Sequence, residues 1–101
     1  MIKKVYTLAK QLPKSEDYNL KQQLKRAIIS VSLNIAEGKN RSTSKDFANF
    51  LSISVASLSE VEAILDICIE LNYLTSDKKI NQDINLLAKK INVFRSKLLR
   101  K

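Results

Sequence analysis

The stretch from Asp46 to Leu71, DFANFLSISVASLSEVEAILDICIEL, decides the fold of this chain. Apolar and small residues recur along it every three or four positions in two separate stripes. The first stripe is Phe47, Phe50/Leu51, Ser54, Leu58, Val61, Leu65 and Cys68, and the second is Ile53, Ser57, Ile64, Ile67 and Leu71. A helix with two apolar stripes must bury more than one side. The stretch therefore predicts a long helix with neighbouring helices on more than one side.

Residues around this stretch mark the ends of the predicted helix. Thr43 and Asp46 match a capping box, in which the first side chain accepts a hydrogen bond from the backbone of the later residue. We therefore expect a helix over residues 44–72. Small side chains crowd its first half and would let a neighbouring helix approach closely. They are Ser52, Ser54, Ala56, Ser57 and Ser59.

The C-terminal segment has the clearest single stripe in the sequence. Its apolar residues are Ile80, Ile84, Leu87, Ile91, Phe94 and Leu98. Alternating spacings of four and three indicate one apolar helix face. We expect a helix over residues 77–100, with Ser76 or Asp77 as its N-cap.

Two further helices are predicted in the N-terminal part of the chain. Apolar periodicity indicates one helix over residues 2–12 and another over residues 16–37, separated at Pro13. The first has about three turns and is too short to flank its partners along their length. Either a neighbouring subunit covers the gap, or the segment derives from a longer ancestral helix. We expect residues 1–101 to form one all-α domain, an antiparallel up-down four-helix bundle with a short first helix.

Composition favours a small domain in a reducing compartment. The chain has 101 residues with one glycine and one proline, which leaves little room for long loops or hairpins. Its single cysteine, Cys68, cannot form an internal disulfide. No apolar run approaches the ~20 residues that cross a bilayer, and the N-terminal apolar part is too short for a signal peptide. We expect a cytoplasmic protein that does not bind a membrane.

The residues that most enzymes use are missing from the sequence. It contains no histidine, which removes catalytic triads, the usual general base and the metal sites of di-iron bundles. Glu62, Asp66 and Glu70 follow at four-residue spacing and could in principle hold a hard cation. Such a row is more often a solvated or ion-paired edge, here facing lysines of a neighbour. We expect no catalytic residue, no metal and no cofactor, and hence no enzyme.

The only glycine, Gly38, follows the last periodic residues of the second predicted helix in NIAEGKNR, Asn34–Arg41. A phosphate-binding P-loop would need a preceding strand and the pattern Gly-x-x-x-x-Gly-Lys-Ser/Thr, and the sequence has neither. We interpret Gly38 as the helix C-cap, where a residue turns to positive φ at little cost.

Charge is distributed unevenly along the chain. The net charge of +8 divides into +7 over residues 1–45, −6 over residues 46–77 and +7 over residues 78–101. Basic residues on the polar sides of helices bind phosphates without reading bases, although a solvated helix face has the same pattern. The candidate nucleic-acid contacts are Lys21, Lys25, Arg26, Lys39, Arg41, Lys45, Lys89, Lys90, Arg95 and Lys97. The phenylalanines lie on core stripes, so base-stacking platforms are not expected.

The order of residues from Arg26 to Leu74 resembles the four-helix-bundle family encoded in intervening sequences of 23S rRNA genes. The core of that family's pattern is Ser-Ile-Pro-x-Asn-Ile-Ala-Glu-Gly, followed by Arg-x-Ser, Asp/Glu-Phe-x-x-Phe-Leu, Ser-Leu-x-Glu and Gly-Tyr-Leu. The residues that match are Asn34, Ile35, Ala36, Glu37, Gly38, Arg41, Phe47, Phe50, Leu51, Ser57, Leu58, Glu60, Tyr73 and Leu74. Two positions depart from the pattern, with Ser32 in place of the proline and Asn72 in place of the last glycine.

The resemblance implies a bundle that assembles as a ring, typically a homopentamer. It also implies kinship with the accessory variability determinant of diversity-generating retroelements, a basic pentameric barrel that binds nucleic acid and partners a reverse transcriptase. The partners that follow from it are further copies of this chain, RNA or DNA, and a reverse-transcriptase-like protein.

Two functions fit these observations. The leading hypothesis is a non-enzymatic homo-oligomer whose basic surface binds RNA or DNA with little sequence preference. The alternative is a protein-interaction adaptor that docks an acidic protein partner without binding nucleic acid. The salt dependence of nucleic-acid binding separates the two, because phosphate contacts release counterions.

Overall fold

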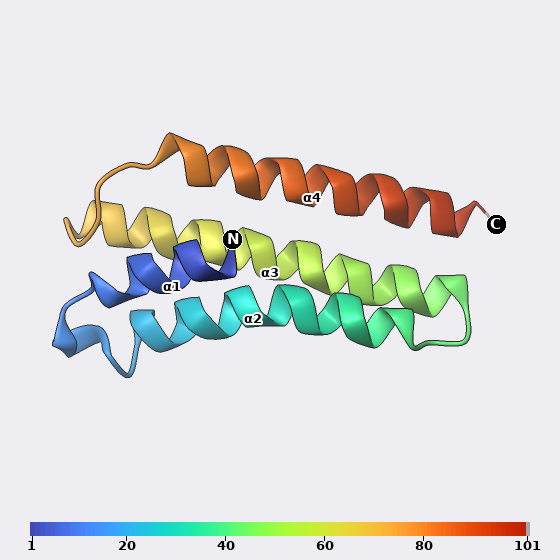
Figure 1. Ribbon diagram of the computed structural model, residues 1–101, viewed down its shortest axis with the longest axis horizontal. Helices are drawn as coiled ribbons and strands as arrows, with labels where there is room; N and C mark the ends of the chain where they lie inside the picture. The colour runs from blue at the N-terminus through green and yellow to red at the C-terminus, as the bar shows by residue number, and fades with distance from the viewer. Residues whose placement is uncertain (101) are drawn as a thin grey trace.

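The computed structural model describes residues 1–100, which form α-helices joined by short connections and contain no strand. The elements are α1 (Ile2–Lys10), the 3₁₀ turn η1 (Lys14–Glu16), α2 (Leu20–Lys39), α3 (Ser44–Glu70) and α4 (Lys78–Leu99). Successive helices run in opposite directions (Figure 1). The expected antiparallel four-helix architecture with a short first helix is confirmed.

The helices are arranged as a layer with a partial cover. The helix pairs in close contact are α1–α2, α2–α3 and α3–α4. In Figure 1, α2, α3 and α4 lie side by side with α3 in the middle, and α1 overlies only the end where α2 begins. At about 1.5 Å per residue, the nine residues of α1 span about 14 Å and the twenty residues of α2 about 30 Å. One half of the layer therefore has a covering helix and the other half has none.

The core follows the first predicted stripe of α3, whereas Ile53, Ile67 and Leu71 of the second stripe are exposed. α3 contributes the most central side chains, among which Leu58 and Val61 are fully buried. Leu24 and Ile28 of α2 belong to the same core cluster, and Val5 and Ala9 of α1 are fully buried in it. The two-sided burial of α3 results from α2 on one flank and α4 on the other.

The contact between α2 and α3 is close and partly polar. The buried hydroxyl of Ser54 donates a hydrogen bond to the carbonyl of Val31 at 2.9 Å, and the hydroxyls of Ser30 and Ser57 lie 2.9 Å apart. Each hydroxyl is satisfied, so burying it costs little. Of the small residues that were expected to allow close helix packing, Ser54 and Ser57 do so against α2, whereas Ala56 and Ser59 are exposed.

Gly38 is not a helix cap, and the sequence-based interpretation of it is wrong. α2 continues through Gly38 to Lys39, and its C-cap is Asn40 with φ of −91°. No glycine in residues 1–100 has positive φ. Glycine is required here for space, since a Cβ atom at this position would lie 2.7 Å from Cδ1 of Phe47 and 3.0 Å from Cβ of Phe50.

The left-handed turn lies instead at the end of α3. Asn72 has φ of 62° and is the one non-glycine residue with positive φ in the described part of the chain. Its N–H donates to the carbonyl of Ile69 at 3.0 Å, and the N–H of Tyr73 donates to the carbonyl of Cys68 at 2.9 Å. These two bonds form a Schellman motif, which ends α3 at Glu70 rather than at residue 72.

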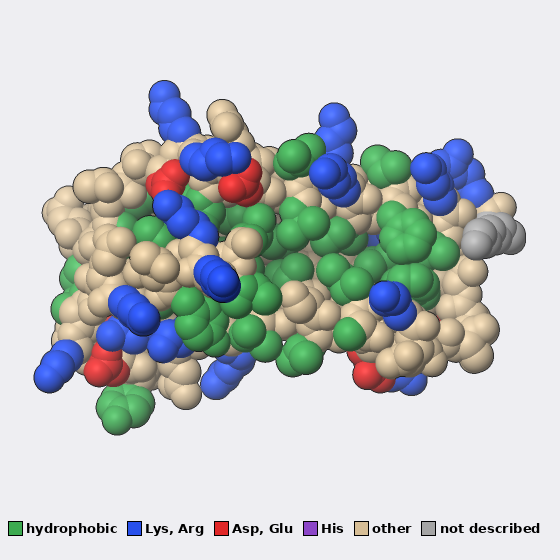
Figure 2. Space-filling view, in the orientation of Figure 1, with side chains coloured by type: hydrophobic (Ala, Val, Ile, Leu, Met, Phe, Trp, Pro, Cys, Tyr) green, Lys and Arg blue, Asp and Glu red, His purple; other side chains and the backbone are tan. Residues whose placement is uncertain are grey.

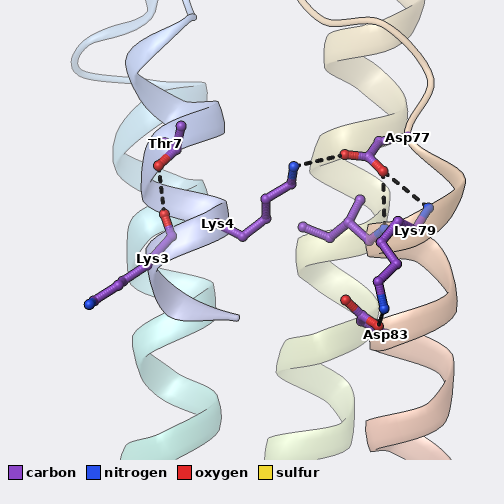
Figure 3. Close-up of polar contacts among 7 residues, drawn as sticks. Lys3, Lys4, Thr7, Asp77, Lys79 and Asp83 are labelled. Carbon is purple, nitrogen blue, oxygen red and sulfur yellow. Dashed lines mark hydrogen bonds and ion pairs between the residues drawn. The ribbon is translucent and has the colours of Figure 1, made fainter.

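The N-caps of α3 and α4 are as expected. The Thr43 hydroxyl accepts a hydrogen bond from the N–H of Asp46 at 3.1 Å. The carboxylate of Asp77 accepts hydrogen bonds from the N–H groups of Lys79 and Ile80 at 3.1 and 3.2 Å (Figure 3). Each cap satisfies N–H groups that have no partner within the helix.

Asp77 also connects the start of α4 with α1. Its second carboxylate oxygen lies 3.3 Å from the Lys4 ammonium on α1 (Figure 3). The pKa of Asp77 lies below its usual value, chiefly because the Ile80 N–H bonds the charged form and also because Lys4 is adjacent. This ion pair ties α1 to the start of α4.

Two N-terminal boundaries differ from the predicted ones. α1 ends at Lys10 rather than at residue 12, and α2 begins at Leu20 rather than at residue 16. The segment between them contains η1, which follows Pro13. A 3₁₀ turn has the same acidic and polar residues as a helix start, which explains why the start of α2 was predicted four residues too early.

Candidate nucleic-acid interface

The ten predicted basic contacts lie at three places on the fold. The first group is on α2, the second surrounds the connection between α2 and α3, and the third is on α4. In that order the groups are Lys21, Lys25 and Arg26; Lys39, Arg41 and Lys45; and Lys89, Lys90, Arg95 and Lys97.

Two of the ten are already paired with carboxylates. Lys21 forms an ion pair with Asp17, and Arg41 forms one with Glu37. The Arg41 guanidinium also lies 4.6 Å from the centre of the Phe50 ring. Both acids precede their partners by four residues, which is the spacing of neighbours on a helix surface, so the sequence contained the signal.

Arg95 faces the interior of the layer rather than solvent. Its Nε donates to the Ser52 hydroxyl on α3 at 2.6 Å, and the residue is half-buried. This bond joins α4 to α3 across their polar flank. Arg95 is therefore a poor phosphate contact, which its position on the sequence did not show.

Lys25 and Arg26 line a hollow of about 380 Å³ on α2 beside α1. The Lys25 ammonium lies 5.3 Å from the centre of the Tyr6 ring. The amides of Gln22 and Asn34 line the same hollow. Two cations, two amides and an aromatic ring thus share one face, and the sequence analysis had not connected Tyr6 with this group.

The exposed outer side of α4, the α4 face, mixes lysines with apolar side chains. Its residues are Leu86, Lys89, Lys90, Val93, Phe94 and Lys97, which line a shallow hollow of about 400 Å³. The apolar members are 52%, 49% and 45% exposed in sequence order. The three lysines have no ion-pair partner among residues 1–100.

Phe94 was expected in the core and is instead exposed. Its ring packs edge to face with the Phe47 ring, with centroids 5.4 Å apart and planes at 86°. Phe94 lies in the C-terminal half of α4, and this half of α4 extends beyond α1 in Figure 1. The prediction failed because periodicity indicates which side of α4 is apolar but not whether a partner is present.

A second hollow connects α4 with α2 across this uncovered half. Ile35 and Lys39 of α2 line it together with Lys90 and Phe94 of α4, and Phe47 and Leu51 form its floor. Figure 2 shows hydrophobic side chains gathered over this part of the molecule with Lys and Arg at its rim. Lys39 and Lys90, about fifty positions apart in the sequence, thereby share one site.

The acidic residues of α3 form no ion pair with these cations within residues 1–100. Glu60, Asp66 and Glu70 are exposed and form no ion pair within residues 1–100. Glu62, by contrast, is half-buried. No group of three or more potential metal ligands occurs in the described residues.

The two groups whose pKa is raised are held protonated by their surroundings. Burial, with a contribution from the charge of Glu16, raises the pKa of the Cys68 thiol. The Tyr73 hydroxyl donates to the Glu16 carboxylate at 3.1 Å, and this bond is the main cause of its raised pKa. A buried neutral thiol is a poor nucleophile, so Cys68 acts as a packing residue.

Comparison with known families identifies the family of this chain. The model of the 23S rRNA-intervening sequence protein family matches residues 1–93, and the chain belongs to that family. No curated protein matches it. Within residues 1–100, every helix is too short or too polar to cross a membrane.

Proposed function

We propose that this protein is a non-enzymatic homo-oligomer, a pentamer by resemblance, whose basic surface binds RNA or DNA with little sequence preference. The observation that supports this proposal is the set of exposed cations on α2, at the start of α3 and on α4 that form no ion pair within residues 1–100. They are Arg26, Lys39, Lys45, Lys89, Lys90 and Lys97.

The hollow on α2 is the best single place for a phosphate contact. Lys25 and Arg26 provide two positive charges, and the amides of Gln22 and Asn34 add neutral hydrogen-bonding groups. Such groups position a nucleic-acid backbone, whereas sequence is read by side chains that reach base edges in a groove. These residues lie on α2, which packs within the bundle and does not protrude from it. A helix in this position does not enter a groove to reach base edges, so the arrangement favours binding without sequence preference.

A second candidate function is supported by the α4 face. Leu86, Val93 and Phe94 are half-exposed between lysines, and apolar side chains contribute little to a phosphate contact. This mixture suits an acidic protein surface, such as one on a reverse-transcriptase-like partner. The adaptor hypothesis therefore rests on the α4 face alone, whereas the nucleic-acid hypothesis rests on cations of α2, α3 and α4.

Fluorescence anisotropy with a labelled structured RNA and a duplex DNA, each in two sequences, tests the leading proposal. We expect binding that weakens steeply with salt and differs little between the two sequences. Replacing Lys25 and Arg26 together by glutamine should weaken binding and reduce the slope of log affinity against log salt by about 2, since each lost phosphate contact removes about 0.9.

Lys79→Gln is the matched control, because Lys79 is exposed but already paired with Asp83. It should leave the salt slope nearly unchanged. Absence of binding at low salt to all four probes would reject the nucleic-acid proposal and leave the adaptor.

A further inference from the structure

The hollow on α2 beside α1, named here the α2 hollow, is apolar in its middle. Besides Lys25 and Arg26, it is lined by the side chains of Ile29 and Leu33. Ile29 is half-buried, and Leu33 is 62% exposed, more than any other leucine, isoleucine or valine in residues 1–100. Apolar side chains contribute little to a phosphate contact, so this part of the hollow suits a different part of a ligand.

The two cations give the α2 hollow one charged end. Neither Lys25 nor Arg26 forms an ion pair within residues 1–100. The ring of Tyr6, whose centre lies 5.3 Å from the Lys25 ammonium, attracts this charge and holds it beside the hollow. Two cations that line one hollow without a carboxylate partner suit a phosphate group.

The other end of the α2 hollow has a fixed hydrogen-bond acceptor. The side-chain NH₂ of Asn34 donates to the carbonyl of Ser30 at 2.8 Å and to the Ser30 hydroxyl at 2.9 Å. That hydroxyl is itself held 2.9 Å from the hydroxyl of Ser57. These bonds orient the amide and leave its Oδ1 atom without a donor among residues 1–100. Because Asn34 lines the hollow, this oxygen is available to a ligand.

The order of these groups along α2 matches the order of groups in one nucleotide. Arg26 and Asn34 are eight residues apart, about 12 Å along the helix axis, with Ile29 and Leu33 between them. A nucleotide has a phosphate at one end, the flat face of a base in the middle, and N–H groups at the far edge of that base. In a duplex this edge is used for base pairing, whereas an unpaired base presents it to a protein.

We propose that the α2 hollow binds one unpaired nucleotide of a single-stranded RNA or DNA. Lys25 and Arg26 contact the phosphate, and Ile29 and Leu33 contact the face of the base. The Oδ1 atom of Asn34 accepts a hydrogen bond from the edge of the base. Every base has an N–H group at this edge, so the site retains little sequence preference. This inference rests on the nucleic-acid binding of the proposed function and names single strands as the preferred class.

Fluorescence anisotropy with a labelled oligouridine and an RNA duplex of the same length tests the inference at low salt. The protein should bind the single strand more tightly, although the duplex has the higher charge density. Leu33→Ser should weaken oligouridine binding about fivefold, because the contact with the base is lost. Asn34→Ala should cause a similar loss of about fivefold by removing the acceptor. Both variants should keep the wild-type affinity for the duplex and the wild-type salt slope, because the phosphate contacts remain.

Leu86→Ser is the matched control, because Leu86 is an exposed leucine between lysines on the α4 face. It should leave both affinities unchanged. Circular dichroism should show that all three variants are folded, and light scattering should give them the wild-type mass.

Three results would overturn the nucleotide site but leave the proposed function in place. They are equal wild-type affinity for the two probes, wild-type oligouridine binding by Leu33→Ser, and a reduced mass of Leu33→Ser, which would place Leu33 between copies of the chain. Absence of binding to both probes would reject the nucleotide site and the nucleic-acid proposal together.

Discussion

The half of the bundle that α1 covers and the half that it does not cover have similar apolar side chains, but these side chains are buried to different extents. Where α1 covers the layer, Val5 and Leu24 are fully removed from solvent. Beyond the end of α1, Phe94 lies on an equally apolar stripe and is 45% exposed. The lysines Lys39 and Lys90 rim the uncovered half, whereas Lys4 and Asp77 close the covered half by an ion pair. An apolar helix stripe is therefore a core only where a second helix reaches it.

The largest expected effect is the difference in unfolding free energy between a side-chain truncation in the covered half and one in the uncovered half. Leu24→Ala should lower the free energy of unfolding by about 2–5 kcal/mol, because it leaves a cavity in packed surroundings. Phe94→Ala should cost only about 1 kcal/mol, because roughly half of the ring is already in water. Urea unfolding of both variants measures the difference. Equal costs would show that a partner covers Phe94 as fully as α1 covers Leu24.

The second expected effect is a loss of stability at the close contact between α2 and α3. Gly38→Ala places a Cβ atom against Phe47 and Phe50, and such overpacking costs roughly 1–3 kcal/mol. The better helix propensity of alanine returns about 1 kcal/mol, which leaves a net loss of about 1 kcal/mol. Thermal unfolding measures this loss. A stabilised variant would mean that the rings move aside and that the contact is looser than its distances indicate.

The smallest effect concerns the turn after α3, at the covered end. Asn72→Ala should lower stability by about 1 kcal/mol, because alanine adopts the left-handed conformation less readily than asparagine. Asn72→Gly should be neutral or slightly stabilising at the same φ. Thermal unfolding of the pair distinguishes a conformational effect from a side-chain contact. If both variants lose the same stability, the asparagine side chain is what matters.

Much of the fold could be predicted from local sequence. The first stripe of α3 predicted its core side correctly, but most of the second stripe is exposed. Thr43 and Asp77 predicted two helix starts, because caps depend on a few adjacent residues. Gly38 could not be interpreted locally, since Phe47 and Phe50, which require its small size, belong to another helix. Glycine is common both at helix ends and at close contacts, and only the fold distinguishes them.

The candidate site was less predictable for the same reason. Spacing alone could have paired Arg41 with Glu37, but it could not show that Arg95 faces Ser52 or that Lys39 and Lys90 share a hollow. Side-chain partners across helices depend on how far each helix is rotated about its axis. Periodicity predicts that rotation only for the apolar side.

Light-scattering mass of the pure protein, with and without a short structured RNA at two salt concentrations, tests the central claim most directly. The account predicts a particle of about five chains that takes up RNA at low salt and releases it at high salt. A multimer indifferent to RNA would favour the protein adaptor. A monomer that does not bind RNA at either salt concentration would contradict both the assembly and the proposed function.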